Sequence, residues 1–230
     1  MSSFNYSKKL IVFIGIFLLF KNSLAGSYDD FFRALRVDDA RTVQSLLNRG
    51  FDPNTPDENG RSGLLIALQV PSPKAAEVLI RAEQTKVDTR NDKDESPLML
   101  AALRGQKALV ELLIWREADI NKTGWTPLHY AASGGHADIA KLLLEQSAYI
   151  DAESPNGTTP LMMAAMYGTP EVVQLLLDEG ADSSLKNQLG MTALDFAKHG
   201  SRKDAIQMLQ ALPKSMDSVQ PKKFSASPGR

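Results

Sequence analysis

The stretch Thr126-Pro127-Leu128-His129-Tyr130-Ala131-Ala132 returns in altered form along most of this chain. Related stretches begin at Ser62, Ser96, Thr159 and Thr192, so that successive starts are 34, 30, 33 and 33 residues apart. A period near 33 residues is typical of repeat proteins, in which each repeat is one supersecondary unit and neighbouring units bury a shared core. The period therefore predicts a row of stacked units.

The repeated stretch has the features of a helix start. Pro127 stands where the first helical turn leaves an amide without a partner, and Thr126 just before it can cap the free amides. In the third unit, Leu98, Ala101 and Ala102 fall at positions i, i+3 and i+4, the spacing of one buried helical stripe. We interpret the motif as a structural signal rather than as an active site.

A second helix is expected after each of these starts. The run Val172-Val173 with Leu175-Leu176-Leu177 is too apolar for a solvated helix and must pack between neighbouring units. Gly180 then supplies a left-handed helix stop, as Gly50 does earlier in the chain. Each period therefore predicts two short helices and a connecting segment.

With this period, the Thr-Pro-Leu-His element and the alanines that follow it, the sequence resembles the ankyrin repeat family over roughly residues 28–212. The resemblance implies an all-α solenoid of about six stacked helix-turn-helix units joined by β-hairpin fingers. The repeat domain is expected to span residues 26–212. Its six units are expected near residues 28–57, 58–91, 92–121, 122–154, 155–187 and 188–212.

The terminal units depart from the pattern. Residues 28–57 lack the Thr-Pro-Leu-His element but keep apolar positions at Phe31, Phe32 and Leu35. A terminal repeat has one neighbour and a polar outer face, and the charged last unit fits the same description. Because both ends look capped, we expect a monomer.

The connection before the fourth unit is three residues short, which leaves Lys122-Thr123 in a finger and places Trp125 beside it. One interpretation is neutral drift in loop length, with the indole packed on a neighbouring finger. The other is a partner-shaped gap with an aromatic anchor, because tryptophan is enriched among binding hot spots.

The first 25 residues have the pattern of a signal peptide. Lys8 and Lys9 precede an eleven-residue apolar run, and Ser23-Leu24-Ala25 places small residues where a signal peptidase cleaves. The apolar run is shorter than a membrane span. We expect cleavage after Ala25 and a periplasmic protein with no membrane contact after cleavage; the alternatives are secretion or an uncleaved N-terminal anchor.

Composition excludes several function classes. The chain has no cysteine, so disulfides, thiolate nucleophiles and cysteine metal sites are impossible. The net charge of −1 becomes about −7 for residues 26–212, once the three lysines of the signal segment and the excess of three positive charges in residues 213–230 are set apart. Such a body disfavours nucleic-acid binding. The basic tail, residues 213–230, is expected to be disordered; it either solubilises the end of the domain or contacts an acidic partner.

No catalytic, cofactor or metal site is expected. His129 and His136 occupy positions at which the family resemblance implies structural hydrogen bonds, and His199 has no second histidine at metal-ligand spacing. Neither a nucleophile elbow nor a phosphate-binding glycine loop occurs in the sequence. We therefore predict a protein that is not an enzyme.

The resemblance also indicates where a partner would bind. Ankyrin repeats usually contact partners through the finger tips and the concave face of the first helices. On this chain the implied contact residues are Arg61, Glu95, Leu103, Arg104, Trp125, Ser133, Thr158, Met166, Tyr167 and Met191. The leading hypothesis is an exported adaptor that binds another protein, such as an enzyme that it stabilises or inhibits. The alternative is a secreted effector acting on a host or competitor protein.

Overall fold

The structure is a computed structural model that describes residues 26–70 and 73–212. Within these ranges the regular structure is helical, apart from one isolated β-bridge between Pro56 and Ser62. The predicted all-α class is thus confirmed, although the fingers contain turns in place of the expected β-hairpin strands. The predicted signal peptide and the predicted basic tail lie outside the described residues, as do residues 71 and 72.

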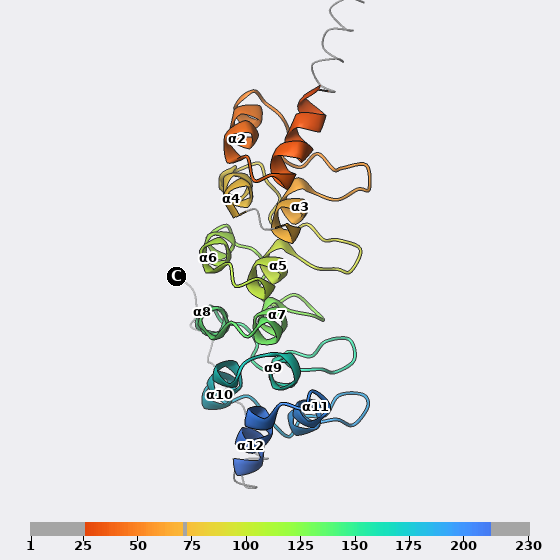
Figure 1. Ribbon diagram of the computed structural model, residues 1–230, viewed down its shortest axis with the longest axis vertical. Coiled ribbons are helices and arrows are strands. Elements are labelled where there is room, and N and C mark those ends of the chain that lie inside the picture. Colours follow the sequence, from red (N-terminus) through yellow and green to blue (C-terminus); the bar gives the residue numbers. More distant parts are fainter. Residues whose placement is uncertain (1–25, 71–72, 213–230) are drawn as a thin grey trace, which may run out of the picture. The chain divides into compact units, whose positions relative to one another are not determined.

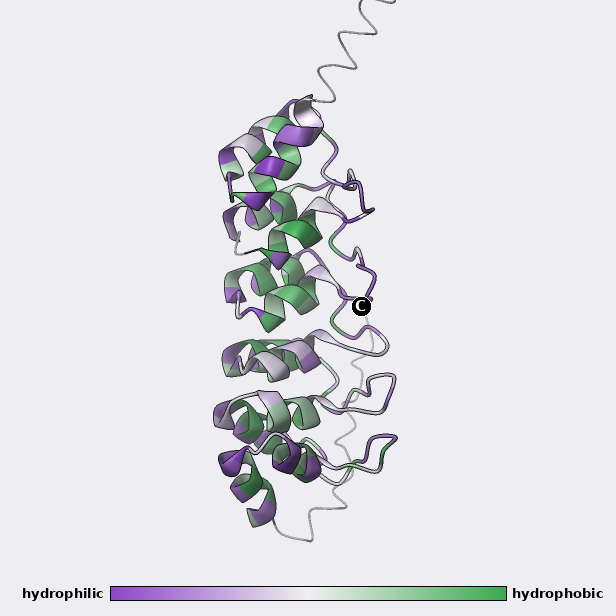
Figure 2. Cartoon of the chain, turned by 45° about the vertical axis from the view of Figure 1, so that its right-hand side comes forward, coloured by the Kyte–Doolittle hydropathy of each residue, from purple (hydrophilic) through white to green (hydrophobic). Residues whose placement is uncertain are grey.

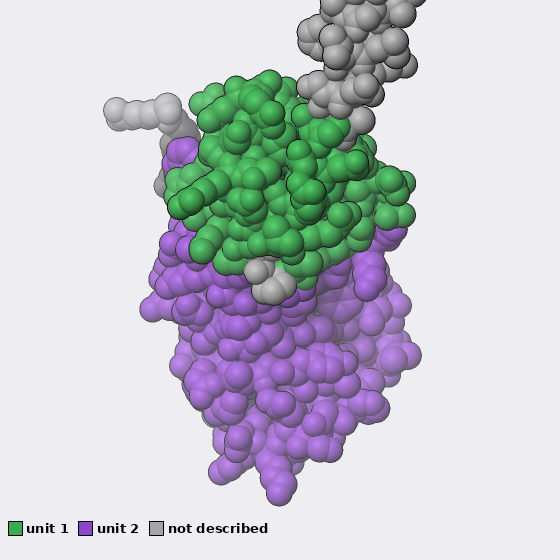
Figure 3. Space-filling view, turned by 45° about the horizontal axis from the view of Figure 1, so that its top comes forward, with its two compact units in different colours: residues 1–91 green, residues 92–230 purple. Residues whose placement is uncertain are grey.

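The chain forms two compact units, residues 1–91 and 92–230 (Figure 3). The division falls at the boundary predicted between the second and third repeats. The first unit contains a helical segment at residues 26–36, followed by α2 (Ala40–Asn48), α3 (Gly63–Gln69) and α4 (Pro73–Arg81). The second unit contains α5 (Pro97–Leu103), α6 (Lys107–Trp115), α7 (Pro127–Gly134), α8 (Ala137–Glu145), α9 (Pro160–Tyr167), α10 (Pro170–Asp178), α11 (Ala193–His199) and α12 (Lys203–Ala211).

The second unit is a stack of four helix pairs in two layers (Figure 1). Helices α5, α7, α9 and α11 contact one another in order and form the layer nearer the fingers. Helices α6, α8, α10 and α12 form the other layer, and each packs on the helix that precedes it in the chain. This arrangement confirms the predicted helix-turn-helix repeats.

The repeated motif starts helices as predicted. The side chains of Ser96, Thr126 and Thr159 each accept a hydrogen bond from a backbone N–H in the first turn of α5, α7 and α9. A proline follows each of these caps at the first helical position. Such a cap typically stabilises a helix by about 1 kcal/mol.

The second helices bury the apolar positions that their sequence predicts. Val172, Val173 and Leu176 are buried in α10, whereas Leu175 and Leu177 are half-buried. Hydrophobic and hydrophilic residues accordingly alternate around the helices in Figure 2. Burying a side chain of this size stabilises the fold by about 1.5–3 kcal/mol, so these interfaces between pairs supply the core.

Four of the second helices, α2, α6, α8 and α10, are followed by a residue with left-handed backbone conformation. Gly50 and Gly180 hold this position with φ of 86° and 92°, as predicted. After α6 and α8 the same position is held by Glu117 and Ser147, with φ of 61° and 65°. A side chain there costs about 1–2 kcal/mol relative to glycine, so these two stops are strained.

Successive pairs in the second unit are also joined by side chains that reach back to the preceding pair. His136 Nε2 donates to the carbonyl oxygen of Leu103 at 3.0 Å. Thr169 Oγ1 donates to the carbonyl oxygen of Gly135 at 3.4 Å, and the Arg202 guanidinium donates to that of Gly168. These bonds set the spacing of neighbouring pairs.

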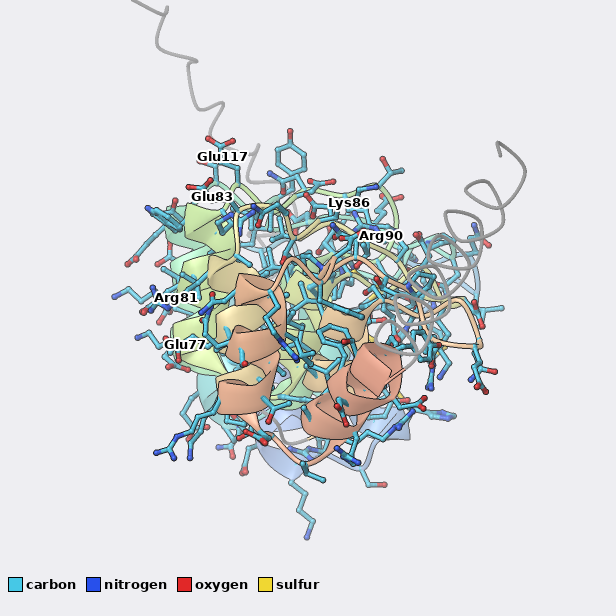
Figure 4. The ribbon with its side chains drawn as sticks, turned by 90° about the horizontal axis from the view of Figure 1, so that it is seen from above. Glu77, Arg81, Glu83, Lys86, Arg90 and Glu117 are labelled. Carbon is cyan, nitrogen blue, oxygen red and sulfur yellow. The ribbon has the colours of Figure 1, made fainter. Side chains whose placement is uncertain are left out.

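The end helices have the expected character of caps. Phe31 and Leu35 are fully buried in residues 26–36, whereas α12 exposes its polar residues, including Lys203 and Gln207. Exposed charges often pair on one helix, as Glu77 and Arg81 do on α4 at 2.8 Å (Figure 4). Within residues 26–70 and 73–212, no helix is both long and apolar enough to cross a membrane.

Candidate functional site

Three neighbouring helices of the second unit end in residues that the sequence assigns to partner contact. Leu103 ends α5 and Arg104 caps it, Ser133 lies in the last turn of α7, and Met166 and Tyr167 close α9. Because α7 contacts both α5 and α9, the structure brings these five residues to one edge of the helix layer. We call them the inner strip.

The inner strip exposes apolar surface. The exposed fractions are 37% for Leu103 and 55% for Tyr167, while Met166 is half-buried. Arg104 is exposed beside Leu103. Between the two ends of the strip, α7 contributes only the short side chain of Ser133, followed by Gly134. The strip therefore offers two separated apolar side chains and one cation.

The backbone under the strip is tightly packed. The carbonyl oxygen of Leu103 accepts the bond from His136. A Cβ atom at Gly134 would lie 2.6 Å from that oxygen, and one at Gly200 would lie 2.7 Å from the carbonyl oxygen of Met166. Both distances are too short for a side chain. The end of α7 is therefore held close to the end of α5, and the end of α11 is held close to the end of α9. The backbone that carries the strip is thus held in a fixed arrangement.

Trp125 is half-buried and contacts its own repeat. Its ring meets the imidazole of His129 edge-on, with centroids 5.2 Å apart and planes at 75°. Because His129 follows Trp125 in the same repeat, this contact differs from the expected packing on a neighbouring finger. Part of the indole remains exposed.

The finger before α7 is short, as its length predicts. The fingers at residues 154–158 and 187–191 are closed by backbone bonds, from Ser154 N to Thr158 O and from Asn187 N to Met191 O, each 3.0 Å long. Residues 120–125 only bend, and their connection reaches less far than those after α8 and α10 (Figure 1).

Lys122 ties this short finger to the loop before α5. Its ammonium group pairs with Asp94 and donates to the carbonyl oxygen of Thr123 at 3.1 Å, and its side chain is only 12% exposed. An ion pair therefore fixes the short finger to the loop before α5. The gap in the row of fingers is smaller than the loss of three residues alone would leave.

Three other predicted contact residues have roles inside the fold. Arg61, in the first unit, donates through Nε and Nη2 to Asp57 at 2.9 and 2.7 Å. Glu95 accepts a 3.0 Å bond from the Tyr130 hydroxyl, whose pKa is raised first by burial and then by this carboxylate. Met191 closes its finger through its backbone.

Thr158, predicted as a partner contact, is buried. It is 2% exposed, its N–H donates to Ser154 Oγ at 3.0 Å, and its carbonyl oxygen accepts from His129 Nε2 at 2.8 Å. The end of the finger is folded against the neighbouring helix start, so the position before the Thr-Pro pair is internal here.

The histidines have structural positions. Burial lowers the pKa of His129 to about 4, against the opposing effect of hydrogen bonds that the imidazole donates to the backbone of Thr158 and Ala152. The predicted structural hydrogen bonds of His129 and His136 are confirmed. His199 is exposed at the end of α11. In the part of the chain that the structure describes, no group of three or more acidic or histidine side chains could hold a metal ion.

Four exposed apolar residues were missed by sequence reasoning: Val37 in the first unit, which is 68% exposed, and three residues in the second unit. The exposed fractions of Trp115, Tyr149 and Leu189 are 72%, 67% and 80%. Trp115 ends α6 at the position where α8 and α10 end in Glu145 and Asp178. An alignment of the repeats at the last residue of their second helices would have shown a tryptophan in α6 where α8 and α10 have acidic residues.

Comparison with known proteins gives consistent matches. The family model described as "Ankyrin repeats (3 copies)" matches residues 31–123, 72–154 and 148–218. The crystal structure of an ankyrin repeat domain from Acinetobacter baumannii AYE is 25% identical, with a TM-score of 0.67. That match covers 78% of this chain and 95% of the other.

Among curated proteins, the chain is 35% identical to Neurogenic locus notch homolog protein 1 of Xenopus tropicalis over 124 residues, which are 53% of this chain and 5% of that protein. It is also 35% identical to the rat (Rattus norvegicus) Ankyrin repeat and SAM domain-containing protein 6 over 109 residues, or 46% of this chain and 12% of the relative. The chain thus spans a small part of each relative, and the likeness concerns the repeats.

Proposed function

Because the chain belongs to the ankyrin repeat family, we propose that it is a non-catalytic module that binds another protein through the inner strip and the adjacent fingers of its second unit. Ankyrin repeats are generally protein-protein interaction modules. In this proposal the repeats provide the scaffold, and the residues that vary from repeat to repeat select the partner.

One observation carries the proposal: Leu103 and Tyr167 are exposed at the ends of α5 and α9, which pack on opposite sides of α7. Exposed apolar surface of this kind often marks an interface. Tyrosine and arginine are enriched among residues that dominate binding energy, and Arg104 lies next to Leu103. A partner would bury the tyrosine ring and the leucine while pairing an acceptor with the guanidinium.

We further propose that the chain acts after export to the periplasm. The support is the basic, apolar and small-residue succession in residues 1–25, which lie outside the described residues. The absence of cysteine is compatible with a compartment in which thiols oxidise. The partner would then be another periplasmic protein.

The double substitution Leu103→Ala and Tyr167→Ala is expected to weaken partner binding at least tenfold. Truncating a hot-spot side chain typically costs more than 1 kcal/mol of binding energy, and about 1.4 kcal/mol corresponds to tenfold. Partners would be captured from periplasmic extract, identified by mass spectrometry and then measured individually by calorimetry.

The matched control is Tyr149→Ala, because Tyr149 is an exposed tyrosine of the same unit outside the inner strip. A partner that is lost with the double variant and retained with the control supports the strip. Equal affinity for the double variant, the control and the unchanged chain would show that the strip is not the binding surface.

The export proposal predicts a mature protein that begins at Gly26. Expression in a bacterium with two membranes, followed by cell fractionation and intact-mass measurement, should place a chain lacking residues 1–25 in the periplasmic fraction. The substitution Ala25→Arg removes the small residue before the cleavage site and should leave the full-length chain at the membrane. An unprocessed wild-type chain in the cytoplasm would reject export.

A further inference from the structure

A groove of about 540 Å³ lies on the outer helices of the second unit, between α8, α10 and α12. Its apolar lining comes mainly from Pro170 and Leu175 of α10 and from Met208 of α12, all of which are half-buried. The groove shares no residue with the inner strip. It is large enough to receive one or two side chains of another segment.

Carboxylates surround this apolar surface. Asp138, Glu171 and Asp178 line the groove and are exposed, and Lys141 is the single basic residue of the lining. A hydrogen bond from the Thr169 side chain lowers the pKa of Glu171, so its carboxylate is charged at neutral pH. The ammonium group of Lys107 lies 3.8 Å from Asp138, an exposed pair that offsets little of this charge.

Helix dipoles account for only part of this arrangement. Asp138 and Glu171 lie in the first turns of α8 and α10, where the dipole favours a negative charge. Asp178, however, is the last residue of α10, where the dipole disfavours one. Gln174 Nε2 donates to it at 2.7 Å but brings no charge. A carboxylate held at this end of the groove suits a cation from elsewhere.

We propose that the segment of residues 213–230 of the same chain binds in this groove. This segment lies outside the described residues, and its sequence contains four basic residues and one acidic residue. Lys222-Lys223-Phe224 combines two cations with an aromatic ring. The ring would cover Leu175 and Met208, and the lysines would pair with the carboxylates at the rim.

The segment is long enough for this contact. Met208 lines the groove four residues before Leu212, after which the segment begins. Lys222 lies ten positions after Leu212, which allows a reach of about 35 Å, whereas packed helices are about 10 Å apart. Attachment to the same chain gives an effective concentration in the millimolar range, about enough for a weak contact to be occupied.

Disulfide trapping tests the proposal cleanly, because the chain contains no cysteine. The full-length variant Gln174→Cys with Ser225→Cys places one thiol in the groove and one beside Phe224. The matched control combines Ser225→Cys with Leu189→Cys on the finger of residues 187–191, where the side chain is 80% exposed. We call the cysteines at positions 174 and 225 the groove pair. Under the same mild oxidant, we expect the groove pair to form its intramolecular disulfide at least tenfold faster than the control pair.

Adding Glu171→Gln and Asp178→Asn to the groove pair, or raising the salt concentration, should slow the reaction toward the control rate. Equal disulfide-formation rates for the two cysteine pairs would overturn the proposal. It would also be overturned if neither the two carboxylate substitutions nor added salt changed the rate of the groove pair. A disulfide that forms only between two molecules would also overturn it and would assign the groove to a second copy. These results are independent of binding at the inner strip.

Discussion

Lowering the pH from about 6.5 to about 4 is expected to remove about 3 kcal/mol of unfolding free energy through His129 alone. The imidazole is fully buried, and its pKa in the folded protein is about 4. An unfolded chain binds this proton near pH 6.5. Between the two values only the unfolded state is protonated, so stability falls with decreasing pH by about 1.4 kcal/mol per unit.

The hydrogen bonds around His129 explain why the folded state resists the proton. The carbonyl oxygen of Thr158 can only accept, so Nε2 carries a hydrogen and donates to it at 2.8 Å. The backbone N–H of Thr126 can only donate, so Nδ1 is bare and accepts at 3.2 Å. This neutral tautomer satisfies both ring nitrogens. A proton added to Nδ1 would meet the N–H of Thr126, which is also a donor. It would also place a positive charge on a buried ring, which is unfavourable.

Urea denaturation at a series of pH values measures this effect as the difference between the unchanged chain and His129→Gln, which cannot titrate. The His199→Gln variant is the matched control, because it removes an exposed histidine and leaves His129 in place. If His129→Gln proves too unstable, nitrogen NMR of the wild-type imidazole should show a bare Nδ1 down to about pH 5. A ring protonated at pH 6 would contradict the prediction.

The sequence predicted the scaffold well because each of its signals is local. A cap, a proline and an apolar stripe act within one or two turns, so the starts of α5, α7 and α9 could be read from Ser96, Thr126 and Thr159. The structural role of His129 followed from the family resemblance. Its partner Thr158 could not be inferred from a single repeat, because the bond joins residues 29 positions apart.

The candidate site was less predictable because exposure depends on neighbouring repeats. Leu103 and Tyr167 are exposed, whereas Thr158, a contact residue implied by the same family resemblance, is buried against His129. The ion pair between Lys122 and Asp94 joins two loops that are distant in sequence, so the short finger alone could not reveal it. Trp115 was missed because the repeats were compared at their motifs rather than at their helix ends.

Glycines also show where sequence reasoning stops. Gly180 and Gly168 both belong to the fifth repeat, and the sequence predicted a role only for Gly180, as a helix stop. The structure separates them: Gly180 has φ of 92° and open space around it, whereas Gly168 has φ of −75° and is crowded. Gly180 is present for its backbone conformation, and Gly168 for the absence of a side chain.

The substitution Gly168→Ala is therefore expected to destabilise the second unit by about 3 kcal/mol, near the upper end for overpacking. The new Cβ would lie 2.4 Å from the carbonyl oxygen of Ala132 in α7, and 2.9 Å from both Cα and the carbonyl oxygen of Ala164 in α9. All three are backbone atoms of packed helices, so no side-chain rotation can relieve the contact. The helices α7 and α9 would have to move apart.

The control Gly180→Ala should cost only about 1–2 kcal/mol, because it introduces backbone strain without a clash. Urea midpoints of both variants give the comparison, and hydrogen exchange should locate the loss at α7 and α9 for Gly168→Ala only, since repeats interact with their nearest neighbours. Equal costs would mean that α7 and α9 yield easily to an added methyl group. That outcome would also weaken the inner strip as a preorganised surface, because the same close packing holds Ser133 between Leu103 and Tyr167.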